Sequence, residues 1–478
     1  MRTQVSGDSI ATTKTSPAPV ATTTPTAAQL GQLGQLGQLG QLSEADAVRR
    51  LVVRLGFGPK PGELASASGA GFAAALARLT SPTGTDAGVA ATPVPALAPT
   101  VRLGRKPADA TALAARKAAR QAIVAQGRTL GSWWLDRMAA ADEPFSERMT
   151  WFWHTHFATS IQKVLYPKLM YLQNDTFRRL GRGDFRELAH AMIVDPAMLI
   201  WLDGQGNQKG KPNENLAREF MELFTLGVGN YTESDVREAA RALTGWKLNF
   251  ASDTPRFVSR LHDPGPENLL GQPGSYDATG YVNRLIQEPA SPKYIAGRIW
   301  TRFVSDTPPD AATMGRLLSA YGPNHDITAL IRAAATTPQF SDPSSVLVKE
   351  PVLWLVGAQR ALGVSASTLP APVFRAGLTG LGQLPFAPPS VGGWPAGVPW
   401  LTTAAALTRL RLGQQLAAHA NLSAVSTTSP SGRIDATASL LGLGRFTDRT
   451  AAALKPLINH PAQLVGLALT APEYTVSA

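Results

Sequence analysis

The fold of this chain is decided by a stretch near its middle, Pro212-Asn213-Glu214-Asn215-Leu216-Ala217-Arg218-Glu219-Phe220-Met221-Glu222-Leu223-Phe224. Its apolar residues, Leu216, Phe220, Leu223 and Phe224, recur every three to four positions, which is the spacing of one buried face of an α-helix. Asn213 is a residue type favoured at helix N-termini, and the helix dipole stabilises a carboxylate such as Glu214 there. We therefore expect a helix over Asn213–Leu226.

The same period recurs along most of the chain. It predicts further helices over Ser43–Leu55, Phe145–Phe157, Phe185–Val194, Asp235–Leu243, Tyr281–Gln287, Pro292–Phe303, Thr313–Tyr321, Ile327–Thr336, Pro351–Leu362, Thr402–Ala420 and Thr447–Leu457. Strand patterns are scarce, and one small hairpin is expected from Phe257–Leu261 and Leu269–Gln272, joined by the turn-rich His262–Glu267. The predicted fold class is all-α, a multi-helix globular fold with one small β-hairpin.

Composition limits what else the chain can be. Of its 478 residues 44% are hydrophobic, enough for a packed core, and no run approaches the roughly 18 apolar residues of a membrane span. The Cys count is 0, which excludes disulfides, thiolate nucleophiles and Cys-ligated metals.

The chain divides into a tail and one long region. Residues 1–43 have a low-complexity composition, with a tandem Gly-Gln-Leu repeat over Gly31–Leu42, and we expect them to be disordered. Residues 44–478 form the predicted helical region, with a flexible Pro-, Ala- and Gly-rich loop near 81–100. No charged start followed by an apolar segment is present, so the sequence predicts a cytoplasmic protein.

The charge is strongly basic, with 45 Lys+Arg against 34 Asp+Glu and a net charge of +11. Part of the excess lies between Val101 and Arg128, in and before an Ala-rich segment predicted to be helical from Asp109 to Gln126. These bases are Arg102, Arg105, Lys106, Arg116, Lys117, Arg120 and Arg128. They form either a solvated helix face or a polyanion-binding face. Nucleic acid is not the favoured partner, because no zinc-finger, RNA-binding or helix-turn-helix pattern accompanies them.

Two histidines stand in an aromatic helix, Trp151-Phe152-Trp153-His154-Thr155-His156-Phe157. At 100° per residue His154 and His156 point about 160° apart, so a regular helix cannot direct both at one ion. Each is either a hydrogen-bonded core histidine or an acid, base or metal ligand.

A pair of carboxylates, Glu219 and Glu222, shares a stripe with Asn215 beside the buried face of the central helix. Two carboxylates one turn apart repel each other unless a cation or a proton lies between them. They are either solvated and paired with an arginine such as Arg218, or a catalytic or metal-binding pair.

Three further polar residues could complete a site. Asp203 precedes a Gly-rich loop that leads to the Glu219 helix, and His262 and Asp263 lie in the predicted hairpin turn. Histidine and carboxylates from separate segments are typical ligands of a divalent metal ion. The hypothesis is therefore one pocket in which Glu219, Glu222 and His154 act in catalysis, and His156, Asp203, His262 and Asp263 bind a divalent metal that activates water for hydrolysis. No organic-cofactor site is expected, and no HExxH, nucleophile-elbow or GxGxxG motif supports a specific reaction.

Several motifs in fixed order resemble a known family. They are Arg54–Pro59, Trp153–Phe157, Asp195–Leu199, Pro212–Gly227, Tyr231–Val236, Ala240–Trp246, His262-Asp263, Phe303–Asp306, Lys349–Val352 and Pro388–Pro395. Together they resemble the bacterial family called domain of unknown function 1800, from about residue 43 to 478.

The resemblance implies little chemistry, because the family has no established reaction. Its members often look exported, from which this chain departs by lacking an export signal. They are often encoded beside a sulfatase- or phosphatase-like family, domain of unknown function 1501. That association implies joint action on an anionic or surface polymer. The alternative to a hydrolase is a non-catalytic binding or maturation partner of the sulfatase-like protein. It is suggested by Trp and Pro motifs such as Gly392-Gly393-Trp394-Pro395, which look like surface or packing features rather than reactive groups.

Overall fold

The computed structural model describes residues 41–101 and 109–477. Residues 1–40 of the predicted disordered tail, and three of the predicted polyanion-binding bases (Arg102, Arg105 and Lys106), lie outside this part of the chain. The end of the tail is attached to the protein: the backbone N–H of Leu42 donates to the carbonyl of Ser341 at 2.9 Å, and Ser43 caps the first described helix.

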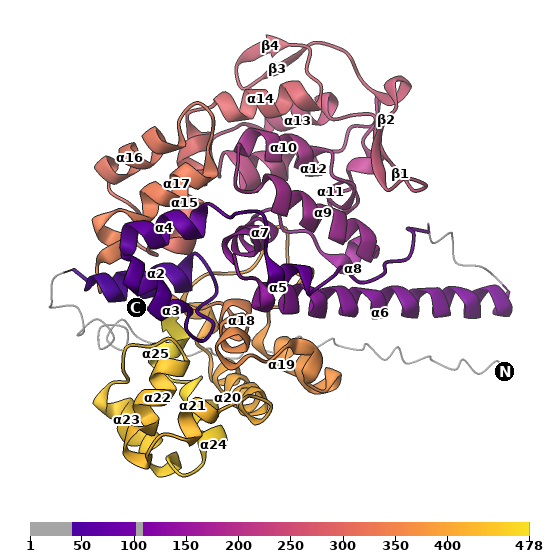
Figure 1. Cartoon of the computed structure of the whole chain (residues 1–478). Coiled ribbons are helices and arrows are strands. Elements are labelled where there is room, and N and C mark those ends of the chain that lie inside the picture. Colours follow the sequence, from indigo (N-terminus) through magenta and orange to yellow (C-terminus); the bar gives the residue numbers. More distant parts are fainter. Residues whose placement is uncertain (1–40, 102–108, 478) are drawn as a thin grey trace, which may run out of the picture.

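The predicted helical fold class is confirmed (Figure 1). The N-terminal third contributes α2 (Glu44–Arg54), α3 (Glu63–Ala70), α4 (Phe72–Thr80), α5 (Ala87–Ala90), α6 (Ala110–Ala140), α7 (Phe145–His156), α8 (Ile161–Val164) and α9 (Pro167–Leu180). The central third contributes α10 (Phe185–Ile193), α11 (Pro196–Trp201), α12 (Asn215–Glu219), α13 (Glu233–Ala242), α14 (Ala278–Gln287), α15 (Ala290–Phe303), α16 (Ala311–Tyr321) and α17 (Ile327–Ala335). The last third contributes α18 (Pro351–Leu362), α19 (Ala371–Leu381), α20 (Thr403–Ala418), α21 (Ser423–Ser426), α22 (Arg433–Leu440), α23 (Asp448–Leu454), α24 (Pro461–Ala468) and α25 (Pro472–Thr475).

Strands form three small antiparallel pairs in the described residues, not the single predicted hairpin. They are β1 (Trp246–Asn249) with β2 (Thr254–Phe257), β3 (Glu267–Leu269) with β4 (Gln272–Gly274), and β5 (Leu347–Val348) with β6 (Val476–Ser477). The predicted pairing of Phe257–Leu261 with Leu269–Gln272 is wrong because each segment has a nearer partner. Leu270 and Gly271 both have positive φ, which suits the two-residue turn that joins β3 to β4.

The helices enclose two hydrophobic clusters of buried residues. The first lies mainly in the part of the molecule built by α2, α4, α10 and α12–α17. The second lies mainly in the part built by α18–α25, together with α6 and α8, and α7, α9 and α11 contribute to both. Phe152 and Trp153 of α7 are buried in the first cluster, and Trp151 is buried in the second. Residues at consecutive positions of a helix point in different directions, so one aromatic helix can join two cores.

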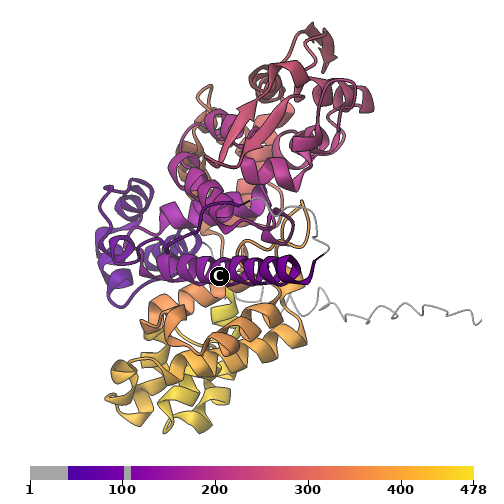
Figure 2. The ribbon, with the colours of Figure 1, turned by 90° about the vertical axis from the view of Figure 1, so that its right-hand side faces the viewer.

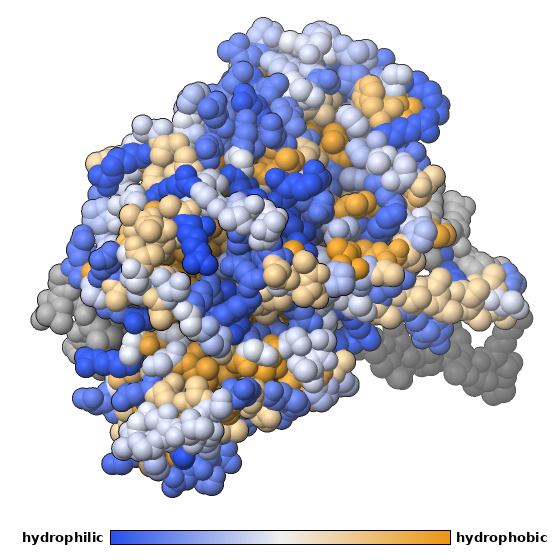
Figure 3. Space-filling model, viewed as in Figure 1, coloured by the Kyte–Doolittle hydropathy of each residue, from blue (hydrophilic) through white to orange (hydrophobic). Residues whose placement is uncertain are grey.

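Helix α6 runs between these two parts in the turned view (Figure 2). The helix predicted from Asp109 to Gln126 is confirmed, with Asp109 as its N-cap, but it continues to Ala140 because Leu130, Trp134 and Met138 supply a buried face. Its N-terminal half projects from the body (Figure 3) and carries the exposed bases Lys117 and Arg120, and the exposed Arg128 follows just beyond it.

The loop near residues 81–100 is attached to the rest of the protein at several points. The Asp86 carboxylate caps the short helix α5 and accepts the backbone N–H groups of Asp142 and Glu143. The Trp133 indole donates to the carbonyl of Thr92 at 3.1 Å. Among the helices of the described residues, none has both the length and the apolar character needed to cross a bilayer.

Candidate functional site

The two histidines of α7 point to opposite sides, as the 100° helical period predicts. His154 packs against Trp134, Trp151 and Phe386 of the second cluster. His156 packs against Phe152, Trp153 and Phe224 of the first. The side chains therefore do not share a ligand position.

His154 holds a strained loop in place. Its Nε2 accepts the backbone N–H of Phe386 at 3.0 Å, and Phe386 has a φ of +63°, in the left-handed region that non-glycine residues rarely adopt. Because Nε2 is an acceptor here, the ring proton lies on Nδ1. Burial lowers the pKa of His154 to about 3, so the ring is neutral at physiological pH.

His156 has the opposite tautomer. Its Nε2 lies 2.9 Å from the carbonyl oxygen of Phe224, which can only accept, so Nε2 carries the proton. Its Nδ1 is buried without a hydrogen-bond partner among the described residues. Burial, together with the nearby charge of Arg298, lowers the pKa of His156 to about 3.

The central stretch is not one regular helix, which corrects the predicted positions of its carboxylates. It forms α12 as far as Glu219 and then a π-helical turn, Phe220–Thr225. A π-turn leaves backbone carbonyls for other partners, and here the Tyr294 hydroxyl donates to Leu223 O at 2.7 Å while His156 donates to Phe224 O. The regular 100° spacing used for Glu219 and Glu222 therefore ends at Phe220.

The carboxylate pair is half-buried and has no arginine partner among the described residues. Arg218 instead pairs with Glu214 and Glu233. Glu222 accepts a hydrogen bond from the hydroxyl of Tyr231. Burial and, to a smaller extent, this hydrogen bond raise the pKa of Tyr231 to about 12. Burial and the charge of Glu222 raise the pKa of Glu219 above its ordinary value.

The other predicted ligands have partners of their own. Asp203 forms an exposed ion pair with Lys163 at 2.8 Å. Nδ1 of His262 lies 3.3 Å from the hydroxyl of Thr244, and that hydroxyl accepts the backbone N–H of Asp263 at 2.8 Å. The Asp263 side chain accepts from the Gly265 N–H and from Arg241, which lowers its pKa.

The predicted metal site is therefore not assembled. Within residues 41–101 and 109–477, no group of three or more His, Cys, Asp and Glu side chains could hold a metal ion. The seven residues do not fit a shared divalent ion, since each structural ligand must reach about 2–2.6 Å from it. Their individual catalytic roles stay predictions.

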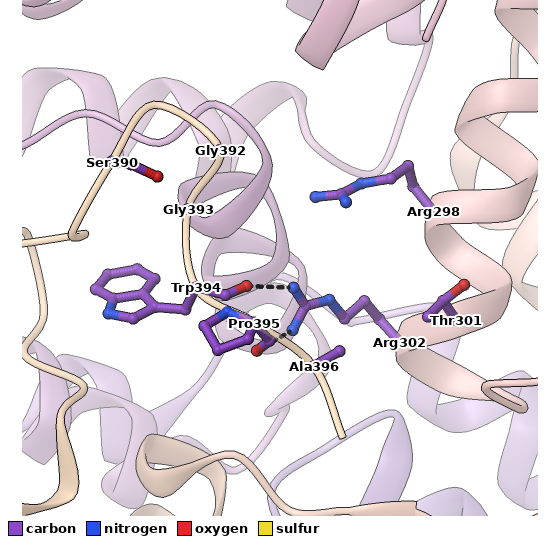
Figure 4. Close-up of a pocket in the computed structure, with 9 residues that line it drawn as sticks. All are labelled: Arg298, Thr301, Arg302, Ser390, Gly392, Gly393, Trp394, Pro395 and Ala396. Carbon is purple, nitrogen blue, oxygen red and sulfur yellow. Dashed lines mark hydrogen bonds between the residues drawn. The ribbon is translucent and has the colours of Figure 1, made fainter. Parts of the chain in front are cut away.

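A polar cavity lies elsewhere, between α15 and the segment Ser390–Ala396 (Figure 4). Its volume is about 330 Å³, and Arg298, Thr301 and Arg302 line one wall. The opposite wall is formed by Ser390, Gly392, Gly393, Trp394, Pro395 and Ala396. We call this cavity the arginine pocket. Its lining residues include two cationic side chains and no acidic one.

The two arginines differ in their partners. Arg302 donates to the buried carboxylate of Glu350 and to the carbonyl of Trp394 at 2.9 Å, so it is fixed in place. Arg298 has no carboxylate of the described residues within 4.0 Å, and its buried Nε has no hydrogen-bond partner among them. Burial lowers the pKa of Arg298, and the nearby Arg302 lowers it further.

The opposite wall is held rigidly by the aromatic core. Trp394 is buried and stacks on Trp151 with ring centroids 5.5 Å apart. Gly393 has a φ of +78°, and a Cβ there would lie 2.4 Å from the carbonyl oxygen of Thr155. A side chain at this position would push the loop away from α7 and from the two arginines.

The pocket arginines extend a polar stripe on α15. Tyr294, Arg298 and Arg302 are spaced four residues apart and so lie on one face of the helix. Tyr294 binds the π-turn that carries Glu222, so the stripe leads from the carboxylate pair to the arginine pocket. A fixed guanidinium beside an unpaired one is an arrangement suited to an oxyanion such as sulfate, phosphate or carboxylate.

Sequence reasoning missed Arg298 and Arg302. The four-residue spacing on the predicted helix Pro292–Phe303 was a visible signal, as was the Gly392-Gly393-Trp394-Pro395 motif. Nothing local to either segment shows that the two face each other.

The structure thus defines a helical protein with an arginine-lined pocket between a helix and a Gly-Gly-Trp-Pro loop. Residues 50–476 match the family model described as "Protein of unknown function (DUF1800)". The chain belongs to this family, as its motifs indicated. Neither the curated proteins nor the solved structures include a match to the chain.

Proposed function

We propose that this protein binds an anionic group of a larger molecule, such as a surface polymer, in the arginine pocket. The observation that carries the proposal is Arg298, a largely buried cation that faces a cavity and has no described carboxylate partner. A buried charge without a counter-charge is costly. An anionic ligand would supply that counter-charge.

The size of the cavity supports a ligand larger than a free ion. At about 330 Å³ it lies at the lower end of the range of roughly 300–1,000 Å³ that is usual for small-molecule sites. It therefore has room for an oxyanion and part of the unit that carries it. Arg302, held by Glu350, provides a preorganised donor for such a group.

Calorimetric titration tests the proposal, with inorganic sulfate, inorganic phosphate and dextran sulfate as probes. Wild-type protein should bind at least one of them, and Arg298→Ala should weaken that binding at least tenfold. Arg298→Lys keeps the charge but loses the planar fork of donors, so it should give an intermediate loss.

The matched control removes three exposed charges from α6, through Lys117→Ala, Arg120→Ala and Arg128→Ala. It should leave binding to the pocket unchanged. A loss in the α6 variant with none in Arg298→Ala would overturn the proposal in favour of the polyanion-binding face predicted from the sequence.

A hydrolase acting on the bound polymer is a second candidate. It is favoured by one observation: the pKa of Glu219 is raised, and Glu219 is a half-buried carboxylate beside Glu222 with no ion-pair partner among the described residues. A carboxyl group with a raised pKa can act as a general acid. No step is assigned to a metal ion, since the predicted ligands do not assemble.

Activity assays decide between a binder and a hydrolase. Glu219→Gln should abolish release of polymer fragments while leaving the affinity for dextran sulfate unchanged. If the wild-type protein releases no fragments from anionic polymers that it binds, the hydrolase candidate is wrong and binding stands alone.

The alternative implied by the family resemblance, a non-catalytic partner of a sulfatase-like protein, requires a direct complex. Co-purification of the two proteins would support it. Failure to associate at micromolar concentration would count against it.

A further inference from the structure

A second cavity, of about 270 Å³, adjoins the arginine pocket and shares Thr301, Arg302 and Ala396 with it. Its walls include the apolar side chains of Phe57, Val348, Leu353, Val398 and Leu401, and Lys349 lines it among them. We call it the lysine pocket. Lys349 stands between strand β5 and helix α18, where its backbone N–H donates to the carbonyl of Thr475 at 2.9 Å.

The amine of Lys349 is held without a carboxylate. Its Nζ lies 3.9 Å from the centroid of the buried ring of Tyr474, and only 8% of the residue is exposed. Among the described residues, no carboxylate oxygen lies within 4.0 Å of it. The two acids that line the lysine pocket are Asp306 and Glu350, and the Glu350 oxygens already accept from Arg302 and Gln383.

The surrounding charges are mainly positive. Arg54, Arg148 and Arg302 line the same pocket, and the backbone at Arg54 and Arg302 accepts from the Arg148 guanidinium. Cations nearby and an apolar surrounding both favour the neutral form of a lysine amine, which is the nucleophilic form. Consistent with this, burial lowers the pKa of Lys349 to about 7.

We propose that Lys349 is a carbonyl-reactive amine, and that the lysine pocket takes an aldehyde or ketone that carries an anionic group. The lone pair of Nζ attacks the carbonyl carbon, and the electrons of the C=O π bond move to oxygen. Transfer of a proton from nitrogen to oxygen gives a carbinolamine, which loses one water molecule to form an imine with Nζ. The anionic group is drawn by Arg148 and Arg302. This inference shares Arg302 with the proposed function of the arginine pocket, but it rests on Lys349, which lines the lysine pocket alone.

Reductive trapping on the intact wild-type chain tests the proposal. The probe is pyridoxal 5′-phosphate, an aldehyde with a phosphate, and borohydride then reduces the imine to a stable secondary amine. Peptide mapping by mass spectrometry gives the labelling rate of each lysine. At pH 7.5 we expect Lys349 to be labelled at least tenfold faster than Lys293, an exposed lysine on α15.

The pH profile separates a reactive amine from an accessible one. Labelling of Lys349 should reach half its maximum near pH 7, well below the pKa of about 10.4 of an ordinary lysine amine. Lys349→Arg replaces the amine by a guanidinium group, which stays protonated and is not nucleophilic, and should abolish the fast phase. The proposal is overturned if Lys349 stays unlabelled at millimolar probe, or if it is labelled no faster than Lys293 across the pH series.

Discussion

Two buried glutamates, Glu147 on α7 and Glu350 before α18, are bound by nearly the same set of groups. Glu147 accepts from Arg137, from Arg178 and from the Trp134 indole at 3.0 Å. Glu350 accepts from Arg302, from Gln383 and from the Trp151 indole at 3.4 Å. The rings of Trp134 and Trp151 are themselves in contact, with centroids 5.4 Å apart.

The difference between them lies in what surrounds the arginines. Glu147 lines neither the arginine pocket nor the lysine pocket, and its arginines are satisfied by it and by neighbouring residues. Glu350 lines the lysine pocket, and its Arg302 lines both pockets. The same carboxylate–arginine–tryptophan arrangement therefore stabilises the fold at one place and positions a donor for a ligand at the other.

The largest effect should come from Glu147→Ala. It leaves two largely buried guanidinium groups, those of Arg137 and Arg178, without their shared carboxylate, which costs about 3–5 kcal/mol of unfolding free energy. Urea unfolding measures the loss. The control, Glu233→Ala, removes an exposed partner of Arg218 and should change stability far less. Similar losses in the two variants would show that Glu147 is not a structural centre.

Glu350→Gln should destabilise less and should also change binding. When residue 350 is neutral, the Arg302 side chain can turn toward the solvent in the pockets that it lines. We therefore expect a loss of about 1–3 kcal/mol in the free energy of unfolding. Because Glu350 then no longer positions Arg302 as a donor, the binding of sulfate or dextran sulfate should weaken severalfold. The matched variant is Glu147→Gln. It should leave the affinity unchanged, because Glu147 lines neither pocket. Equal affinities in the two variants would break the distinction between the two centres.

Acid unfolding should depend on both glutamates. Burial raises the pKa of each, but the arginines more than offset this, so both pKa values lie below the ordinary value in the folded protein. A lowered carboxyl pKa contributes stability that is present above the unfolded-state pKa, about 4.3, and is lost as the pH falls toward the folded value. Urea unfolding at pH 6 and at successively lower pH should show this fall, and each Glu→Gln variant should show a shallower one.

Most of the fold could be predicted because its signals are local. The predicted helix Pro351–Leu362 is found at those residues, and the predicted helix Asp235–Leu243 is found as α13, which Thr232 and Asp235 cap. The π-turn after Glu219 could not be predicted, because it depends on Tyr294 and His156, which bind its carbonyls from other helices. Each strand pair likewise depends on a turn or on a distant partner, as for β5 with β6.

The site was less predictable, because it too depends on contacts between residues that are far apart in the sequence. The helical period correctly placed His154 and His156 on opposite sides, but not their functions, since the Phe386 N–H that His154 binds is 232 residues away. The roles of Arg298 and Arg302 depend on Glu350 and on residues 390–396, which lie far from them along the chain. An arginine indicates an anion-binding site only when it is known to lack a carboxylate partner within the protein, and only the packed structure shows whether it does.

The smallest predicted effect separates the two centres through their indoles. Trp134→Phe and Trp151→Phe remove similar ring volume from fully buried positions, so their packing losses should be similar. Trp134→Phe also removes a 3.0 Å hydrogen bond to a carboxylate, whereas the Trp151 bond is longer at 3.4 Å and correspondingly weaker. We expect Trp134→Phe to cost about 1 kcal/mol more in urea unfolding. Combining each with the Gln variant of its glutamate should remove that difference, because the remaining amide no longer offers a charged acceptor. A difference in stability that persists in the double variants would come from packing. The indole hydrogen bonds to Glu147 and Glu350 would then be equally strong, and the two glutamates would differ only in whether they line a pocket.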